Sequence, residues 1–168
     1  GWGASANVNY DFGDMVLTSI TAYESTEGFS RGDIDGSPGP YTFNFTGPYT
    51  YPELPFSSDT QDSIDELDQT TQELRLASDT TGPLSWQTGV YLFDSSFTIT
   101  TVGPGGYPFP TTLKHENTSW AVFGQARYAV SDVLTLTGGL RYTDDEKALT
   151  VLTAPISNPN VAAGDTVN

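Results

Sequence analysis

Two alternating runs of residues, joined by a short polar break, constrain the fold of this chain more than any other feature. In residues 118–147, apolar and polar side chains alternate at most successive positions, and this period of two is that of a pleated strand. The break at residues 130–132 is too short for the chain to cross over a sheet. The two runs therefore predict a pair of antiparallel strands joined as a hairpin.

One side of this predicted hairpin is apolar and the other side is polar. The apolar side carries aliphatic residues with aromatic residues near the ends, and the polar side carries Gln, Thr and Arg. Such an apolar side faces a second sheet in a soluble sandwich, and it faces lipid in an outer-membrane barrel. Each run can be extended to about ten or more residues, the length that crosses a bilayer at a tilt. Because strands in soluble domains usually have about five or six residues, strand length favours the barrel.

Composition agrees with a turn-rich β protein and excludes several classes of function. The chain has 17 Gly and 11 Pro, and no helical stretch stands out. A net charge of -15 with only 6 basic residues argues against binding to a nucleic-acid backbone. The absence of Cys excludes disulfides and Cys-ligated metals. No apolar run approaches the length of a transmembrane helix, which a barrel would not need.

The same alternation along the rest of the chain predicts an antiparallel meander of about six long strands. Residues 1–147 are expected to form a segment of a transmembrane β-barrel, and residues 148–168 a loop or tail. Long loops are expected at 27–67 and 101–114, because periodicity disappears there among prolines and glycines. The predicted strands cover approximately residues 4–10, 15–25, 69–78, 84–98, 117–128 and 134–147.

Short connections at 11–14, 79–83 and 130–132 alternate with the two long loops. In a meander this alternation gathers the short turns at one edge and the long loops at the other, as in outer-membrane barrels. A loop as long as 27–67 is also unusual in a compact soluble domain.

In the second predicted strand, residues 15–25, the alternation is less regular, and the apolar side is assigned to Val16, Thr18, Ile20 and Ala22.

Three phrases resemble the mid-barrel region of TonB-dependent outer-membrane receptors. They are QELRL at 72–76, FGQ at 123–125 and GGLRYT at 138–143, within a resemblance that covers roughly residues 4–147. The resemblance implies a receptor in the outer membrane that takes up a scarce substrate, such as a siderophore, cobalamin or an oligosaccharide. Its implied partners are outer-membrane lipid, the plug and the remaining barrel strands, and indirectly TonB. The chain is expected to be part of such a receptor, because the family has about 22 strands and nothing here resembles the plug or a signal peptide.

Four charged residues fall on the polar sides of their predicted strands. A charge that faces lipid costs several kcal/mol, so these side chains are expected to face the lumen, where they dock the plug or hold water. Direct contact with a substrate is the weaker alternative. The four lumen-facing charges are Glu73, Arg75, Arg127 and Arg141. On the apolar sides, the aromatic girdle is assigned to Trp86, Trp120, Tyr128 and Tyr142.

The remaining candidate residues carry weaker signals. Asp33 and Asp35 are a weak calcium candidate, but Asn44 stands where a calcium loop would have its twelfth-position Glu, so a solvated acidic loop is favoured. His115 is the single histidine and cannot form a catalytic triad or a metal cluster. No enzyme activity and no cofactor are predicted. Loop aromatics that could stack on a ligand are Tyr41, Phe43, Tyr49, Tyr51, Tyr107 and Phe109.

Two other functions fit the same pattern. An open sheet of six strands would leave two unpaired edges, so the fragment could assemble with its own copies into an extracellular cross-β filament. A soluble β-sandwich that binds carbohydrate is the third possibility. Dependence on detergent distinguishes the receptor from the sandwich, and fibres in plain buffer would identify the filament.

Overall fold

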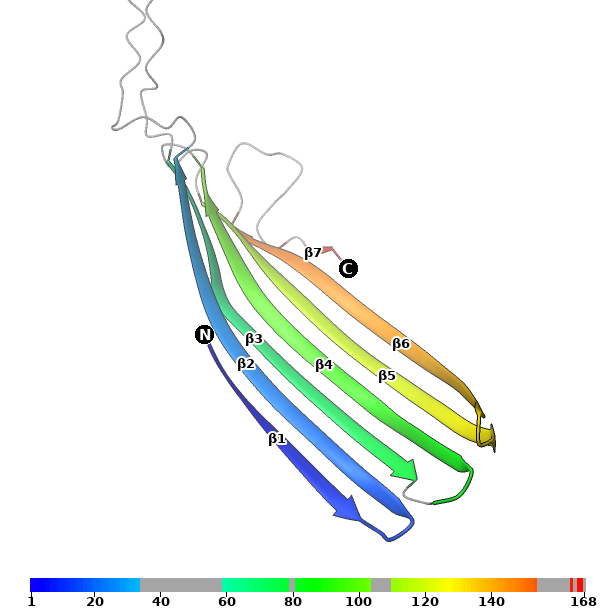
Figure 1. The fold of residues 1–168 in the computed structure, drawn as a ribbon. Coiled ribbons are helices and arrows are strands. Elements are labelled where there is room, and N and C mark those ends of the chain that lie inside the picture. The colour runs from blue at the N-terminus through cyan, green and yellow to red at the C-terminus, as the bar shows by residue number, and fades with distance from the viewer. Residues whose placement is uncertain (34–58, 79–80, 104–109, 154–163, 165, 168) are drawn as a thin grey trace, which may run out of the picture. The chain divides into compact units, whose positions relative to one another are not determined.

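The computed structural model describes residues 1–33, 59–78, 81–103, 110–153, 164 and 166–167. Its strands lie in chain order in a single sheet, each beside the next (Figure 1). The first six are long antiparallel strands, which confirms the predicted all-β meander. The strands are β1 (Trp2–Asp11), β2 (Met15–Asp33), β3 (Asp59–Ser78), β4 (Leu84–Val102), β5 (Thr111–Ser131), β6 (Leu134–Thr153) and β7 (Thr166–Val167).

The strands run beyond the predicted ranges. Strand β2 ends at Asp33 instead of residue 25, and β3 begins at Asp59 instead of residue 69. Strand β6 continues to Thr153, and β7 follows within the predicted tail 148–168. The predicted loops 27–67 and 101–114 are therefore too long at both ends. The physical reason is that the backbone ladder continues where side-chain alternation fades, because its hydrogen bonds do not require an apolar face.

The described residues fall into two compact units. Unit 1 comprises Gly1–Ser25, Asp68–Ser96 and Glu116–Lys147. Unit 2 comprises Thr26–Leu67, Phe97–His115 and Ala148–Asn168. Strands β2 to β6 contribute residues to both units. The predicted lumen charges and the predicted aromatic girdle all belong to unit 1.

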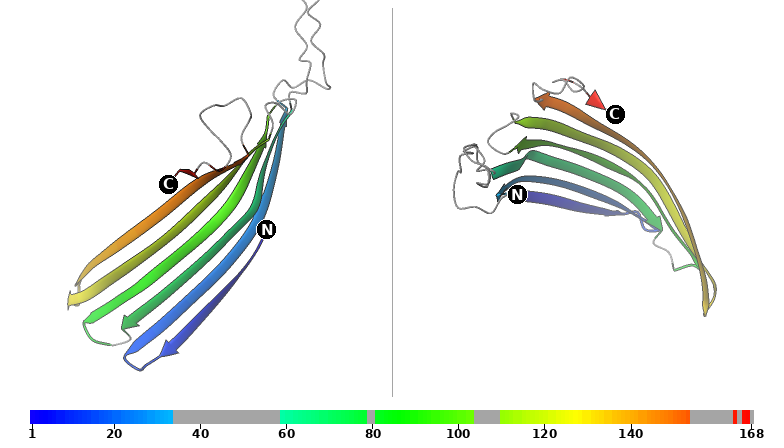
Figure 2. Two further views of the ribbon diagram at one scale, coloured as in Figure 1. Left: turned by 180° about the vertical axis from the view of Figure 1, so that it is seen from behind. Right: turned by 90° about the horizontal axis from the view of Figure 1, so that it is seen from above.

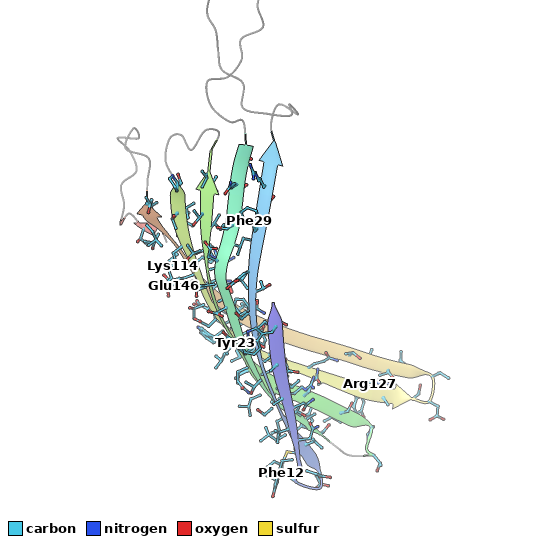
Figure 3. All side chains as sticks on the ribbon, turned by 90° about the vertical axis from the view of Figure 1, so that its left-hand side faces the viewer. Phe12, Tyr23, Phe29, Lys114, Arg127 and Glu146 are labelled. Carbon is cyan, nitrogen blue, oxygen red and sulfur yellow. The ribbon has the colours of Figure 1, made fainter. Side chains whose placement is uncertain are left out.

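Short turns connect the strands of unit 1. The β1–β2 turn is closed by the Phe12 amide, which donates to the Met15 carbonyl at 2.8 Å. The Gly13 amide donates to the Asp11 carboxylate at 2.6 Å. Gly13 has a φ of 95°, a left-handed conformation that glycine adopts without steric cost. Phe12 is labelled at this turn in Figure 3.

The register of β1 with β2 corrects the predicted sides of the second strand. Val8 lies opposite Ser19, and Asn9 lies opposite Thr18, whose hydroxyl donates to the Asn9 side-chain oxygen at 2.7 Å. The residues predicted on the apolar side, Val16, Thr18, Ile20 and Ala22, therefore share a face with the asparagines of β1. A shift of one residue moves every side chain of a strand to the other face, and here turn geometry decided the register because the side-chain pattern of β2 is weak.

Unit 2 is held by polar contacts across the strands. The Thr100 hydroxyl donates to the Asp65 carboxylate at 3.3 Å and lies 3.4 Å from the Thr112 hydroxyl. The ring of Phe97 stacks on His115, with the ring centroids 4.8 Å apart. The two threonines and Asp65 satisfy one another along the ladder, so the strands continue without an alternating apolar pattern. The buried Nδ1 atom of His115 has no hydrogen-bond partner among the described residues.

Side chains project from both faces of the sheet, and neither face carries a second layer within the described part of the chain (Figures 2 and 3). Among the described hydrophobic residues only Ala121 and Val151 are buried. Large apolar side chains such as Leu140, which is 87% exposed, have no protein layer over them. A water-soluble sandwich would need a second sheet on this face. The described residues contain no helix of the length and hydropathy needed to cross a membrane.

Candidate functional site on the polar face

Unit 1 has one apolar face, which can be followed from strand to strand. Ser19 lies opposite Val8, and the Gln72 amide donates to the Ser19 hydroxyl at 3.0 Å, so alternate residues of β3 continue this face. Across β5 and β6, the rings of Trp120 and Tyr142 lie with their centroids 5.6 Å apart. The apolar face carries Val8, Leu74, Leu76, Trp86, Val90, Leu92, Trp120, Val122, Tyr128, Leu140 and Tyr142.

The opposite side of the sheet is the polar face of unit 1. Gln87, Gln125 and Arg127 line one shallow hollow of about 240 Å³ on it. A Cβ atom added at Gly139 would lie 3.4 Å from the Cβ atom of Gln125, which places β6 in phase with β5. The polar face carries Asn9, Glu73, Arg75, Gln87, Gln125, Arg127 and Arg141.

The four residues of the predicted girdle share the apolar face. Trp120 and Tyr142 lie together on neighbouring strands, while Trp86 and Tyr128 lie nearer to the short turns. The rings of Trp120, Tyr128 and Tyr142 are exposed, at 43%, 49% and 58%. The rings therefore lie exposed at two levels of the apolar face, and their role as a membrane girdle stays a prediction.

Sequence reasoning missed two further aromatic pairs. The rings of Trp2 and Tyr23 lie 5.1 Å apart, and those of Tyr10 and Phe12 lie 4.6 Å apart. Figure 3 labels Tyr23 and Phe12 on unit 1. The available signal was spacing, because Trp2 and Tyr10 of β1 are separated by eight positions, as are Trp120 and Tyr128 of β5.

Arg141 lies among aromatic side chains on the polar face. Its guanidinium carbon is 5.6 Å from the centroid of the Tyr91 ring and 6.0 Å from that of Phe123. Its Nε donates to the Thr143 hydroxyl at 3.0 Å. Alternation placed Arg141 on the polar side, but Tyr91 and Phe123 were not predicted as neighbours because that requires the register of three strands.

The other predicted charges are arranged differently. Arg75 lies 3.7 Å from Glu73, and both side chains are partly exposed, so this contact adds about 0–1 kcal/mol at most. Arg127 lines the hollow beside the two glutamines (labelled in Figure 3). Within the described part of the chain, no carboxylate forms an ion pair with Arg127 or Arg141. The structure thus brings Glu73 and Arg75 together, and it gives Arg141 aromatic neighbours instead of a carboxylate.

A small polar cluster interrupts the apolar face between β2 and β3. Gln72 donates to the Ser19 hydroxyl at 3.0 Å and accepts a hydrogen bond from the Thr21 hydroxyl. The Tyr23 hydroxyl donates to the Asp68 carboxylate at 2.5 Å. Because Ser19, Thr21 and Gln72 have partners within the sheet, these neutral side chains are compatible with a face that lacks water. The Asp68 carboxylate would be costly in lipid and is expected at the edge of such a face.

The predicted loop contacts Tyr41, Phe43, Tyr49, Tyr51, Tyr107 and Phe109 lie outside the described residues, as does Asp35 of the weak calcium candidate. The backbone of Asp33 ends β2, and its side chain is not described. Within the described ranges, no group of three or more His, Cys, Asp or Glu could hold a metal ion.

Long antiparallel strands, short turns, one apolar face and aromatic rings at two levels are the features of a transmembrane β-barrel wall. The family model described as TonB dependent receptor-like, beta-barrel matches residues 1–165. The chain therefore belongs to the TonB-dependent receptor-like β-barrel family, whose members are outer-membrane receptors and transporters and are not enzymes. No curated protein and no solved structure matches the chain.

Proposed function

We propose that unit 1 forms part of the wall of a TonB-dependent receptor in the outer membrane. Its apolar face contacts lipid and its polar face contacts the lumen. The receptor takes up a scarce substrate, such as a siderophore, cobalamin or an oligosaccharide, with energy supplied through TonB. The observation that carries the proposal is the two-faced sheet, whose apolar side has no protein layer over it in the described residues and has aromatic rings at two levels.

The spacing of the aromatic rings supports the orientation. Trp120 and Tyr128 are eight positions apart on β5, as are Trp2 and Tyr10 on β1. At about 3.3 Å per residue this spacing is about 26 Å along a strand. Because the strands of such barrels are tilted, this spacing corresponds to about 20 Å along the membrane normal. The lipid-facing band of outer-membrane barrels is about 25 Å tall. The two rows of rings would therefore lie near the two boundaries of the membrane.

The polar face supplies the contacts that a receptor wall needs on its inner side. Glu73, Arg75, Arg127 and Arg141 would face water and the plug, where charge is tolerated, while the same side chains on the lipid face would be costly. Outer-membrane lipid, the plug and the remaining strands are the direct partners in this proposal, and TonB acts indirectly. The loop aromatics stay a prediction for ligand capture.

Cysteine accessibility tests the orientation, and the chain contributes no native Cys to the background. Single variants Val8→Cys, Val122→Cys and Leu140→Cys report on the apolar face, and Gln125→Cys and Thr137→Cys report on the polar face. In the receptor that contains this chain, assembled in outer membranes, we expect a water-soluble maleimide to label only the second group. A lipid-soluble maleimide should label the first group. Equal labelling of both groups by the water-soluble reagent would refute the proposal.

The self-assembled filament stays a second prediction. Strand β1 pairs only with β2 among the described strands, so its other edge presents backbone groups to a further strand. Electron microscopy of the isolated chain in buffer without detergent tests it. Ordered fibres with a repeat of about 4.7–4.8 Å would support the filament, and their absence would reject it.

A further inference from the structure

Tyr91, Phe123 and Arg141 form what we call the Arg141 clamp on the polar face of unit 1. The guanidinium lies over both rings, 5.6 Å from the Tyr91 centroid and 6.0 Å from the Phe123 centroid. Both distances are within the range of about 6 Å over which a cation is attracted to an aromatic face. The hydrogen bond from Nε to the Thr143 hydroxyl, at 3.0 Å, adds a third restraint. The position of the guanidinium is therefore held without a carboxylate.

A glycine against the Phe123 ring makes this arrangement possible. A Cβ atom at Gly89 would lie 2.6 Å from the Cζ atom of Phe123, so only glycine leaves room for the ring in this position. Ala121, two positions before Phe123 on the same side of β5, is 1% exposed. Tyr91 and Phe123 are themselves partly buried, whereas Arg141 is exposed. The clamp is thus a packed base that presents one cation to its surroundings.

The terminal N–H groups of Arg141 have no hydrogen-bond or ion-pair partner among the residues that the structure describes. This is notable in a chain with a net charge of -15, where carboxylates are abundant. Arg75 on the same face does have a carboxylate nearby, that of Glu73. A guanidinium that is held in place and has unused N–H groups is suited to bind the two oxygens of a planar anion.

We propose that the Arg141 clamp binds a carboxylate group that is not part of the described chain. The two carboxylate oxygens accept hydrogen bonds from the terminal N–H groups, and the two rings keep the guanidinium from turning away. The inference rests on the proposed function only because that function places the polar face toward the lumen. In the lumen the carboxylate belongs either to a ligand or to another part of the receptor, and the experiment separates these two sources.

The first measurement is a titration of the detergent-purified receptor that contains this chain with glutarate, followed by saturation-transfer NMR. Glutaramide is the neutral probe of matching size. We expect glutarate to bind and glutaramide not to bind, and Arg141→Gln to weaken glutarate binding at least about tenfold. The affinity of Arg141→Lys for glutarate should lie between that of the wild type and that of Arg141→Gln, because lysine keeps the charge and loses the planar fork. Tyr91→Leu and Phe123→Leu should also weaken binding, although neither removes a charge.

The control variant is Lys147→Gln, which removes one positive charge from the same strand and leaves the clamp intact. Glutarate binding should change less than about twofold in this variant, since exposed charges at a distance are screened by salt. If Lys147→Gln and Arg141→Gln weaken binding equally, the effect is general electrostatics and the proposal is overturned.

The second measurement identifies a carboxylate supplied by the receptor itself. In that case the wild-type receptor does not bind glutarate, and the amine introduced by Arg141→Lys forms a carbodiimide cross-link to an Asp or Glu outside the described residues. Peptide mapping by mass spectrometry gives the position. The proposal is overturned if the wild-type receptor does not bind glutarate and the Arg141→Lys variant forms no such cross-link. A failure of the proposed function can be distinguished from a failure of this proposal, because in that case the water-soluble maleimide would not label Gln125→Cys.

Discussion

Gly89 and Phe123 approach each other so closely on neighbouring strands that no side chain fits between them. A Cβ atom at Gly89 would lie 2.6 Å from the Cζ atom of Phe123 and 2.6 Å from the carbonyl oxygen of Leu74. The second contact is with backbone, which cannot turn aside as a flexible side chain can. This glycine therefore determines where the Phe123 ring lies, and through it the base of the Arg141 clamp.

Replacing this glycine should destabilise the sheet. We expect Gly89→Ala to lower the free energy of unfolding of the receptor by about 1–3 kcal/mol, because the added methyl group overpacks the site. Urea titration of the receptor in detergent measures this. Gly138→Ala is the matched control, since a Cβ atom there would meet nothing within 4 Å. Equal losses in the two variants would show that the close approach has no energetic consequence.

The β1–β2 turn should be sensitive to the backbone conformation of Gly13. With a φ of 95°, an L-residue there is strained, and Gly13→Ala should cost about 1–2 kcal/mol. Asn tolerates the left-handed region better than Ala, so Gly13→Asn should cost less. The same urea titration compares the two variants. A stability of Gly13→Ala equal to that of the wild type would contradict the turn described here.

The polar cluster of Ser19, Thr21 and Gln72 should behave as one unit. Gln72→Leu alone leaves two hydroxyls without their partner, and we expect a loss of about 1–3 kcal/mol. The triple variant Ser19→Ala, Thr21→Val, Gln72→Leu removes all three polar groups and should be nearly neutral. Unfolding in lipid vesicles measures both variants. A triple variant less stable than the single one would mean that the cluster contacts water or a polar partner.

A charge placed on each face should distinguish lipid from lumen. Leu140 is 87% exposed on the apolar face of β6, and the next residue, Arg141, lies on the polar face. Leu140→Arg should destabilise the receptor in lipid vesicles by about 2–4 kcal/mol near the middle of the membrane. Thr137→Arg, three positions earlier and on the polar face, should change the stability by less than about 1 kcal/mol. The reverse order would place lipid on the polar face.

Several expectations from the sequence depended on local rules, and these agree with the structure. Alternation predicted the hairpin of β5 and β6, and the short turn between them, because side chains point to opposite faces at successive residues. The same rule placed the consecutive residues Leu140 and Arg141 on different faces of the sheet. Strand ends were less accurate, since the ladder of β2 and β3 continues where alternation has disappeared.

Register was the main feature that the sequence pattern did not define. Strand β2 has apolar residues on both sides, so either phase was compatible with its composition, and the pairing of Val8 with Ser19 decided against the predicted one. The Arg141 clamp has the same origin. Its three residues come from β4, β5 and β6 and are 18 to 50 positions apart, so no short pattern along the chain links them.

The sequence by itself determined that this chain forms long antiparallel strands with one apolar side and short turns, because period-two alternation and turn residues act over a few neighbouring positions. It also carries enough of the family pattern over residues 1–165 to show a TonB-dependent receptor-like barrel. Only the tertiary structure decided which residues of different strands meet. Cross-strand contacts such as Gly89 with Phe123 depend on register, and register is a property of paired strands that no single strand contains.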